Sequence, residues 1–264
     1  MSSFLHGVRG FMLDMDGTFY LSDRLLPGAV EFWRHAQETG LPFVFLTNNS
    51  SKRRDSYARK FAAMGIDVPA ERILTSGEAT ARYLAQRAPG AKVALFGTPD
   101  LESEFLDHGF RLDMDAPDYV VLGFDMTTDY QRLSRLCDLA RAGLPYIATH
   151  PDINCPVAGG FIPDIGAIMA LVRASTGRDP DVIIGKPNRE IAAMAAGKLG
   201  LPLESLCMVG DRLYTDIAMG QHAPIRTALV LSGETQPDDL KTSPYRPDCI
   251  FSGLGELVAA LKAR

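Results

Sequence analysis

The chain lacks the features that mark several classes of protein. Its 264 residues hold no apolar run of membrane-spanning length, because Asp, Arg, Gly or Pro interrupts every hydrophobic segment. Lys and Arg number 27 against 32 Asp and Glu, and no basic stripe is present, so no nucleic-acid polymer is expected as a partner. The N-terminal segment lacks the charged stretch and long apolar stretch of a signal peptide. These absences predict a cytoplasmic protein that does not span a membrane.

Cysteine is also scarce, and its placement excludes a zinc or disulfide framework. The four cysteines lie far apart in spacings that match no zinc-binding pattern, and a chain of this size needs no disulfides. We therefore expect reduced, mostly buried thiols at Cys137, Cys155, Cys207 and Cys249. The 46% hydrophobic content is enough to build one large domain or two unequal ones.

Short apolar runs alternate with segments of helical period along the chain, which predicts an α/β fold. Buried strands are expected over residues 8–13, 42–46, 206–209, 228–231 and 249–251. Two turn-forming segments, 87–90 and 176–180, flank a stretch of roughly 90 residues with strands and helices of its own, a size at which domains fold. We expect a core of residues 1–88 and 180–264 with an inserted domain of residues 89–179. The strand at 182–184 should then resume the core.

Four polar clusters stand at the ends of separate predicted strands. They are Asp14 with Asp16, Thr47 with Asn48, Lys186, and Asp211 with Asp216. Open α/β sheets bind ligands at the ends of their strands, where carboxylates can hold Mg²⁺, act as nucleophiles or move protons. Each cluster alone also fits a turn, a helix cap or a solvated lysine. Four of them in order, all at strand ends, argue against coincidence.

These clusters carry a resemblance to a known family. Asp14-Met15-Asp16-Gly17-Thr18, Leu46-Thr47-Asn48-Asn49, Gly185-Lys186-Pro187 and residues 210–216 resemble, in order, the four motifs of the haloacid dehalogenase-like (HAD) superfamily of phosphotransferases. The residues that make up the motifs, and the position of the inserted domain, are similar to those of the NagD/4-nitrophenylphosphatase-like subfamily. The resemblance covers essentially the whole chain. It implies a Rossmann-like, doubly wound parallel-sheet core with an inserted α/β cap domain that selects the substrate.

The resemblance also implies a role for each core residue. Asp14 would be the nucleophile that forms an aspartyl-phosphate, and Asp16 would protonate the leaving alkoxide and then deprotonate the hydrolytic water. Mg²⁺ would be held by Asp14, the backbone carbonyl of Asp16 and Asp211. Thr47 and the backbone amide of Asn48 would bind phosphoryl oxygens. Two further residues would support them: Lys186 by binding the phosphoryl group and orienting Asp14, and Asp216 by ordering a metal-bound water or Lys186.

Asp16 separates reaction types within the superfamily. Relatives that dehalogenate carbon centres lack this second aspartate, and transport ATPases carry threonine there. An aspartate points to phosphate-ester hydrolysis or phosphoryl transfer. Thr47 and Lys186 are roughly 140 residues apart, about 90 more than a core needs for its own elements. A lid of that size should exclude bulky substrates such as phosphoproteins, and water.

The inserted domain departs from the subfamily pattern at two positions. In Thr149-His150-Pro151-Asp152, His150 replaces the usual asparagine, and Asp164 stands where glycine is common. His150 could contact the leaving group or be a solvated loop histidine. Asp152 could face the substrate or stabilise a turn. The two departures leave the identity of the substrate open.

The leading hypothesis is a Mg²⁺-dependent phosphatase, a phosphoric monoester hydrolase. Its partner would be a small phosphorylated metabolite, such as a sugar phosphate, a nucleoside monophosphate or phosphoglycolate. The alternatives are phosphoryl transfer to an acceptor other than water and a non-catalytic phosphometabolite-binding protein. An intact Asp16 disfavours the latter, because a sensor needs no acid/base. Many relatives dimerise through the cap, so the resemblance allows a homodimer, for which the sequence shows no interface signature.

Overall fold

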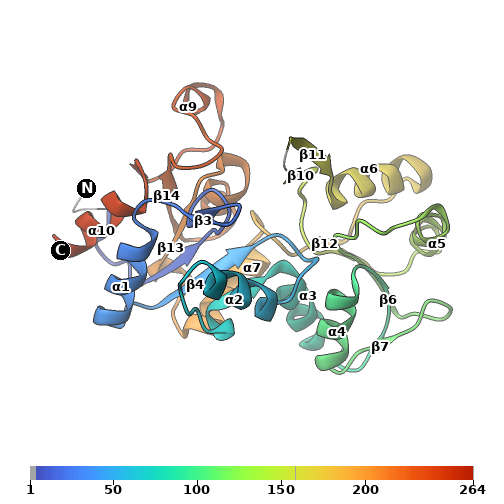
Figure 1. The fold of residues 1–264 in the computed structure, drawn as a ribbon. Helices are drawn as coiled ribbons and strands as arrows, with labels where there is room; N and C mark the ends of the chain where they lie inside the picture. Colours follow the sequence, from blue (N-terminus) through green and yellow to red (C-terminus); the bar gives the residue numbers. More distant parts are fainter. Residues whose placement is uncertain (1–3, 158, 264) are drawn as a thin grey trace. The chain divides into compact units, whose positions relative to one another are not determined.

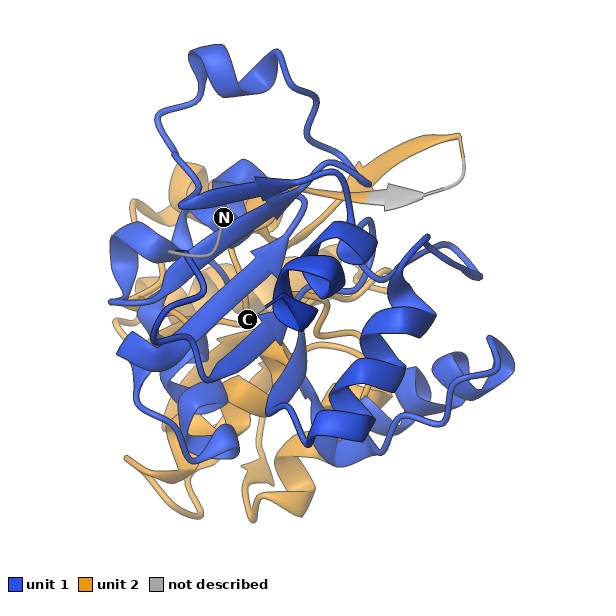
Figure 2. Ribbon diagram, turned by 90° about the vertical axis from the view of Figure 1, so that its left-hand side faces the viewer, with its two compact units in different colours: residues 1–47, 54–74, 186–264 blue, residues 48–53, 75–185 orange. Residues whose placement is uncertain are grey.

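The computed structural model describes residues 4–157 and 159–263 and contains two compact units (Figure 1). Unit 1 comprises residues 1–47, 54–74 and 186–264, and unit 2 comprises residues 48–53 and 75–185 (Figure 2). The chain thus passes between the units after residues 47, 53, 74 and 185, whereas the sequence suggested domain boundaries after 88 and 179. Both units alternate strands with helices around parallel sheets, which confirms the predicted α/β fold class.

A six-stranded sheet with the order β15-β14-β13-β1-β4-β5 forms the centre of unit 1. Its strands are β1 (Gly10–Leu13), β4 (Phe43–Thr47), β5 (Ile73–Thr75), β13 (Leu206–Gly210), β14 (Arg226–Val230) and β15 (Cys249–Phe251). β1 pairs in parallel with both β13 and β4, and β14 pairs in parallel with β13 and β15. The strands that the sequence predicts near residues 8–13, 42–46, 206–209, 228–231 and 249–251 are therefore confirmed.

Helices cover both faces of this sheet. Phe11 and Leu13 of β1 join a core cluster with Phe32 of α1 (Ala29–Thr39) and Leu257 of α10 (Leu254–Lys262). Met12 between them is equally buried but lies outside that cluster, as the alternation of strand side chains requires. Helix α7 (Arg189–Leu199) packs on β4. The other elements of unit 1 are α2 (Arg54–Ala63), α8 (Met219–His222), α9 (Asp239–Thr242), short 3₁₀ turns at Ala70–Arg72 and Leu203–Ser205, a π-helical segment at Leu213–Ile217, and the hairpin β2 (Tyr20–Leu21) with β3 (Arg24–Leu25).

Unit 2 holds a second parallel sheet with the order β12-β9-β8-β6-β7. Its strands are β6 (Lys92–Phe96), β7 (Arg111–Leu112), β8 (Tyr119–Leu122), β9 (Tyr146–Ala148) and β12 (Val182–Ile183). Its helices are α3 (Ser76–Ala85), α4 (Pro99–Asp107), α5 (Tyr130–Arg141) and α6 (Ile165–Thr176). An antiparallel hairpin, β10 (Asn154–Val157) and β11 (Gly160–Pro163), precedes α6.

Capping residues explain where the helices begin and end. The Thr75 side chain accepts a hydrogen bond from the Glu78 amide at 3.0 Å and so caps the start of α3. Helix α1 ends at Gly40, whose φ of 67° is left-handed and suits glycine. The cluster at 47–51, by contrast, caps no helix directly, because α2 begins only at Arg54.

The strand near 182–184 corrects the sequence interpretation. It was expected in the core sheet, but Val182 and Ile183 pair with Ile147 and Ala148 of β9 in the sheet of unit 2. The apolar pattern marks a strand without specifying its partner, and a strand of this length finds its place only through tertiary packing. Helix α3, which the sequence placed before the first boundary, also belongs to unit 2.

The four cysteines are free thiols, with Cys137 and Cys207 buried and Cys155 and Cys249 half-buried. Within the described part of the chain, no helix combines the length and apolar character needed to cross a membrane.

Candidate active site

The strand register of unit 1 brings three of the predicted clusters to one edge of the sheet. Leu13, at the end of β1, is level with Val209 of β13 on one side and Phe45 of β4 on the other. Because all three strands run in parallel, the residues that follow them emerge at the same carboxyl edge. Those residues include Asp14, which is buried, and Asp211, which is buried beyond the end of β13. Thr47, the last residue of β4, is half-buried at this edge.

Lys186 connects two of the carboxylates. Its ammonium nitrogen donates to Asp14 Oδ1 at 2.5 Å and to Asp216 Oδ1 at 2.7 Å, and all three side chains are buried. Burial alone would lower the pKa of Lys186, but the charges of Asp14 and Asp216 outweigh it and raise the pKa above its ordinary value. The lysine therefore stays charged, and it holds the Asp14 carboxylate in one orientation.

Asp211 lies in a tight cradle of donors and glycines. Its Oδ1 accepts from the Thr18 hydroxyl at 3.0 Å, and its Oδ2 accepts from the Glu234 amide at 2.7 Å. A Cβ on Gly17, whose φ is 86°, would come within 2.4 Å of Oδ2, and one on Gly233 within 2.0 Å. Only glycine at both positions lets the backbone approach the carboxylate this closely.

Asp216 sits in the π-helical segment that follows β13. Its Oδ2 accepts from the Arg212 amide at 3.1 Å, while Oδ1 accepts from Lys186. Gly210 is needed beside it, since a Cβ there would lie 2.2 Å from the Asp216 carboxyl carbon. Asp216 therefore contacts both the Asp211 loop, through the Arg212 amide, and the lysine.

Carboxylates outnumber the lysine in this cluster. Oxygen atoms of Asp14, Asp211 and Asp216 lie within 4.8 Å of one another. Burial raises the pKa of Asp211 and Asp216 above the ordinary value, and the negative charge of Asp14 raises both further. Buried oxygen ligands with excess negative charge are the donor set that hard divalent cations prefer. These acidic groups could therefore bind a divalent metal ion.

Asp16 differs from these aspartates in its exposure. It lies two residues beyond Asp14, and its side chain keeps access to solvent. The protein atoms around it still desolvate it enough to raise its pKa, against the opposing charge of Lys60, and the Asp14 charge adds to the rise. A carboxyl with a raised pKa and solvent access is suited to exchanging protons.

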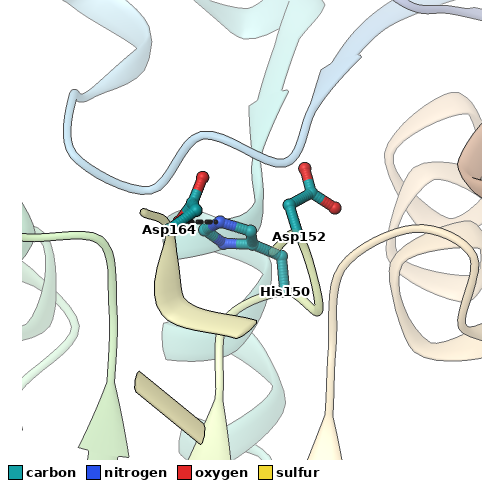
Figure 3. Close-up of side chains that lie close together, drawn as sticks. All are labelled: His150, Asp152 and Asp164. Atoms are coloured by element: carbon teal, nitrogen blue, oxygen red, sulfur yellow. Dashed lines mark hydrogen bonds and ion pairs between the residues drawn. The ribbon is translucent and has the colours of Figure 1, made fainter. Parts of the chain in front are cut away.

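The remaining predicted residues lie in unit 2. Asn48 Nδ2 donates to Asp152 Oδ1 at 2.9 Å. His150 is fully buried, and its Nε2 lies 2.9 Å from Asp164 Oδ1 (Figure 3). The interpretation of His150 as a solvated loop histidine is therefore wrong, because Asp164 and Thr149 occupy both its ring nitrogens inside the unit. Tyr214 is 49% exposed.

The sequence alone did not lead us to expect that residues 232–235, which follow β14, contact the site. Ser232 donates to the Gly17 carbonyl at 2.9 Å, and the amide of Glu234 reaches Asp211. Glu234 also pairs with Arg212 at 2.9 Å. The signal was present, because Ser232-Gly233-Glu234-Thr235 is another polar cluster directly after a predicted strand. Thr18, read only as part of the first motif, proves to be a partner of Asp211.

Comparisons with known proteins identify the family of this chain. Residues 11–111 match the family model of haloacid dehalogenase-like hydrolases, and residues 183–257 match a second, HAD-hydrolase-like model. The acid sugar phosphatase of Staphylococcus saprophyticus is 34% identical over 96% of this chain and 98% of its own length. The chain belongs to the haloacid dehalogenase-like hydrolase family.

Solved structures show which subfamily this chain is similar to. A 4-nitrophenylphosphatase from Thermotoga maritima is 50% identical, with a TM-score of 0.94 over 97% of this chain and 98% of that one. NagD from E. coli K-12 is 34% identical, with a TM-score of 0.88 over 94% and 98% of the two chains. The predicted resemblance to the NagD/4-nitrophenylphosphatase-like subfamily is confirmed, and so is the predicted enzyme class, a phosphoric monoester hydrolase.

Proposed function

We propose that this protein is a Mg²⁺-dependent phosphatase that hydrolyses small phosphate monoesters through an aspartyl-phosphate on Asp14. The observation that carries the proposal is the Asp14–Lys186–Asp216 arrangement beside Asp211, at the carboxyl edge of a parallel sheet. A buried carboxylate that is aligned by a lysine and lies beside further acidic groups can attack phosphorus once the negative charges are neutralised.

Asp14 would open the reaction. Its carboxylate oxygen attacks the phosphorus atom, the bond from phosphorus to the ester oxygen breaks, and the phosphoryl group is transferred to Asp14. Lys186, which holds Asp14 Oδ1, supplies a fixed positive charge for the phosphoryl oxygens and keeps the nucleophile in line. Thr47 and the backbone amide of Asn48 are proposed to bind the other phosphoryl oxygens.

Asp16 would carry the proton in both halves of the reaction. It first protonates the departing alkoxide, and then removes a proton from the water that hydrolyses the aspartyl-phosphate. Its raised pKa and exposed side chain support this role, because a general acid must be protonated when the ester bond breaks. Two easier steps thereby replace one difficult displacement.

The carboxylate oxygens of these acidic groups are the type of ligand atom that Mg²⁺ prefers. Asp14, Asp211 and the backbone carbonyl of Asp16 would hold the ion, and Asp216 would support the site through Lys186 and the Arg212 amide. The bound ion would neutralise charge on the carboxylates and on the phosphoryl group. The excess of carboxylates over lysine is the feature of this chain that supports the assignment.

Sugar phosphates are the substrates that we propose first. The acid sugar phosphatase relative and the phosphatases of the structural comparison support a small phosphorylated metabolite as partner. A cytoplasmic location stays a prediction of the sequence, and a homodimer stays an implication of the family resemblance. A panel of sugar phosphates, nucleoside monophosphates and phosphoglycolate, assayed for phosphate release with Mg²⁺, would rank the candidates.

The decisive test of the mechanism compares leaving groups in an Asp16→Asn variant. An alkyl phosphate needs a proton on its leaving oxygen, whereas 4-nitrophenolate leaves without one. We therefore expect kcat for a sugar phosphate to fall by about 10²- to 10⁴-fold, and the first, burst-phase turnover of 4-nitrophenyl phosphate to fall much less. Rapid-quench kinetics would measure both.

The matched control is Asp55→Asn, which removes the same charge from an exposed position of α2. It should leave both substrates unaffected. Equal losses for the two substrates in Asp16→Asn would contradict the acid role of Asp16. The absence of phosphate release from every ester by the unmodified protein would contradict the proposed function itself.

A further inference from the structure

Side chains of unit 2 that the proposed mechanism does not use hold residues 48–50 in place. Asn48 donates to Asp152 Oδ1 at 2.9 Å, and the Thr149 hydroxyl donates to Ser50 Oγ at 2.9 Å. Ser50 Oγ also accepts from the Phe124 amide at 2.9 Å, next to the end of β8. Segment 149–152 therefore contacts segment 48–50 at two points, one on either side of Asn49.

Segment 149–152 is in turn anchored by a buried pair, His150 and Asp164. His150 is 0% exposed and Asp164 5%, and His150 Nε2 lies 2.9 Å from Asp164 Oδ1 (Figure 3). The same oxygen accepts from the Ile165 amide at 2.6 Å, so it acts as an acceptor, and Nε2 of His150 carries the proton. The other ring nitrogen lies 3.0 Å from the Thr149 hydroxyl.

Backbone hydrogen bonds also connect the loop that contains Asp152 with the start of α6. The Asp164 amide donates to the Ile153 carbonyl at 2.8 Å, and the Gly166 amide donates to the Asp152 carbonyl at 2.8 Å. The loop that carries Asp152 thus lies directly against the start of α6. The bond from His150 to Asp164 is a side-chain connection across this contact, and its burial strengthens it.

We propose that His150 and Asp164 act together as positioning residues for the phosphate-binding segment 48–50. They fix the loop so that Thr149 holds Ser50 and Asp152 holds Asn48. The inference rests on the proposed function, in which the Asn48 amide binds a phosphoryl oxygen. Both positions depart from the subfamily pattern, and the structure joins the two departures in one hydrogen bond.

Two substitutions of His150 separate the roles of its nitrogens. His150→Asn keeps a polar group near Nδ1 and removes the donor at Nε2, whereas His150→Gln can still reach Asp164 with its amide. We expect His150→Asn and Asp164→Asn each to lower kcat/KM for 4-nitrophenyl phosphate by about tenfold to a hundredfold, mostly through kcat. His150→Gln should recover most of the loss. The double variant His150→Asn with Asp164→Asn should be no worse than the poorer single variant.

Hydrogen exchange of the backbone amides provides a readout that needs no turnover. Exchange at residues 48–50, measured by mass spectrometry, should speed up in His150→Asn and return towards normal in His150→Gln. The control is Asp181→Ala, which removes the side-chain acceptor of the Tyr146 amide at the opposite end of β9. This control should lower Tm while leaving kcat/KM and exchange at 48–50 unchanged.

The outcomes separate this inference from the proposed function. If the unmodified protein hydrolyses no phosphate ester, the proposed function fails, and the exchange comparison still decides the positioning role. If the protein is active but His150→Asn and Asp164→Asn retain its kcat/KM and its exchange pattern, the positioning role is refuted. Equal losses in Asp181→Ala would also refute it, because general destabilisation would then explain them.

Discussion

Each unit holds a cluster of carboxylates, but the clusters differ in their balance of charge. In unit 1, three aspartates lie together and Lys186 pairs with two of them, Asp14 and Asp216, while burial and the charge of Asp14 raise the pKa of Asp211 and Asp216. In unit 2, Asp152 and Asp164 each have a hydrogen-bond donor, Asn48 and His150 respectively. An unbalanced buried cluster costs stability unless a ligand completes it, whereas a satisfied one holds the fold together. The difference supports the proposals that unit 1 carries the catalytic residues and that the cluster of unit 2 positions segment 48–50.

Replacing one aspartate by asparagine in each cluster should give the largest difference between the two clusters, in both kcat and Tm. Asp14→Asn removes the nucleophile, so kcat should fall on the order of 10⁴-fold or more. Tm should stay level or rise, because one of three repelling charges is lost. Asp164→Asn should instead lower Tm, since it weakens a buried bond to His150. Phosphate release and calorimetry of the two variants measure both effects, and a clear drop of Tm in Asp14→Asn would remove the distinction between the clusters.

The pH dependence of metal binding should also distinguish the cluster of unit 1 from that of unit 2. A carboxyl with a raised pKa in the folded state binds protons more readily there than in the unfolded chain. The metal-free fold therefore loses stability as pH rises from the ordinary aspartate value of 3.8 towards neutrality. A bound cation replaces those protons, so the gain from Mg²⁺ should grow over this range.

At one fixed concentration, a hundredfold above its Kd at neutral pH, Mg²⁺ should raise Tm by about 5–10 °C near neutral pH and by clearly less at about pH 5. Differential scanning fluorimetry in buffers of matched ionic strength measures the shift. Asp211→Asn should abolish the shift, and Asp164→Asn in unit 2 should retain it. A shift of equal size at both pH values would show that the cation does not replace protons on these carboxylates.

The smallest expected effect concerns a carboxylate of unit 2 outside either cluster. Asp129 caps α5 by accepting from the Arg132 amide at 2.8 Å, so Asp129→Ala should cost about 1 kcal/mol of stability. Asp138→Ala, which breaks only an exposed pair with Arg141, should stay within about 0.5 kcal/mol. Urea unfolding measures both. Neither should change kcat, and a loss of activity in either would mean that catalysis depends on unit 2 more widely than its cluster suggests.

The core motifs could be predicted from the sequence because each has a local signature. Asp14, Asp211 and Thr47 follow apolar runs directly, and parallel pairing brings such positions to one edge. Thr18 and the Glu234 amide were not foreseen as partners of Asp211, since their contacts depend on how two loops fold over the carboxylate. The pairing of strand 182–183 with β9 could not be predicted either, because the apolar pattern of this strand does not specify which strand it pairs with.

The sequence by itself determined the fold class, the family and the residues at the strand ends, because these follow from periodicity and from motifs read along the chain. Tertiary structure alone decided which of those residues share a hydrogen bond and how deeply each is buried. His150 is the clearest case, since a loop histidine next to Pro151 gives no sign of being fully enclosed and bonded to Asp164. Burial and pairing arise between segments that are distant in sequence, and they determine whether a carboxylate is a reactive group or a structural one.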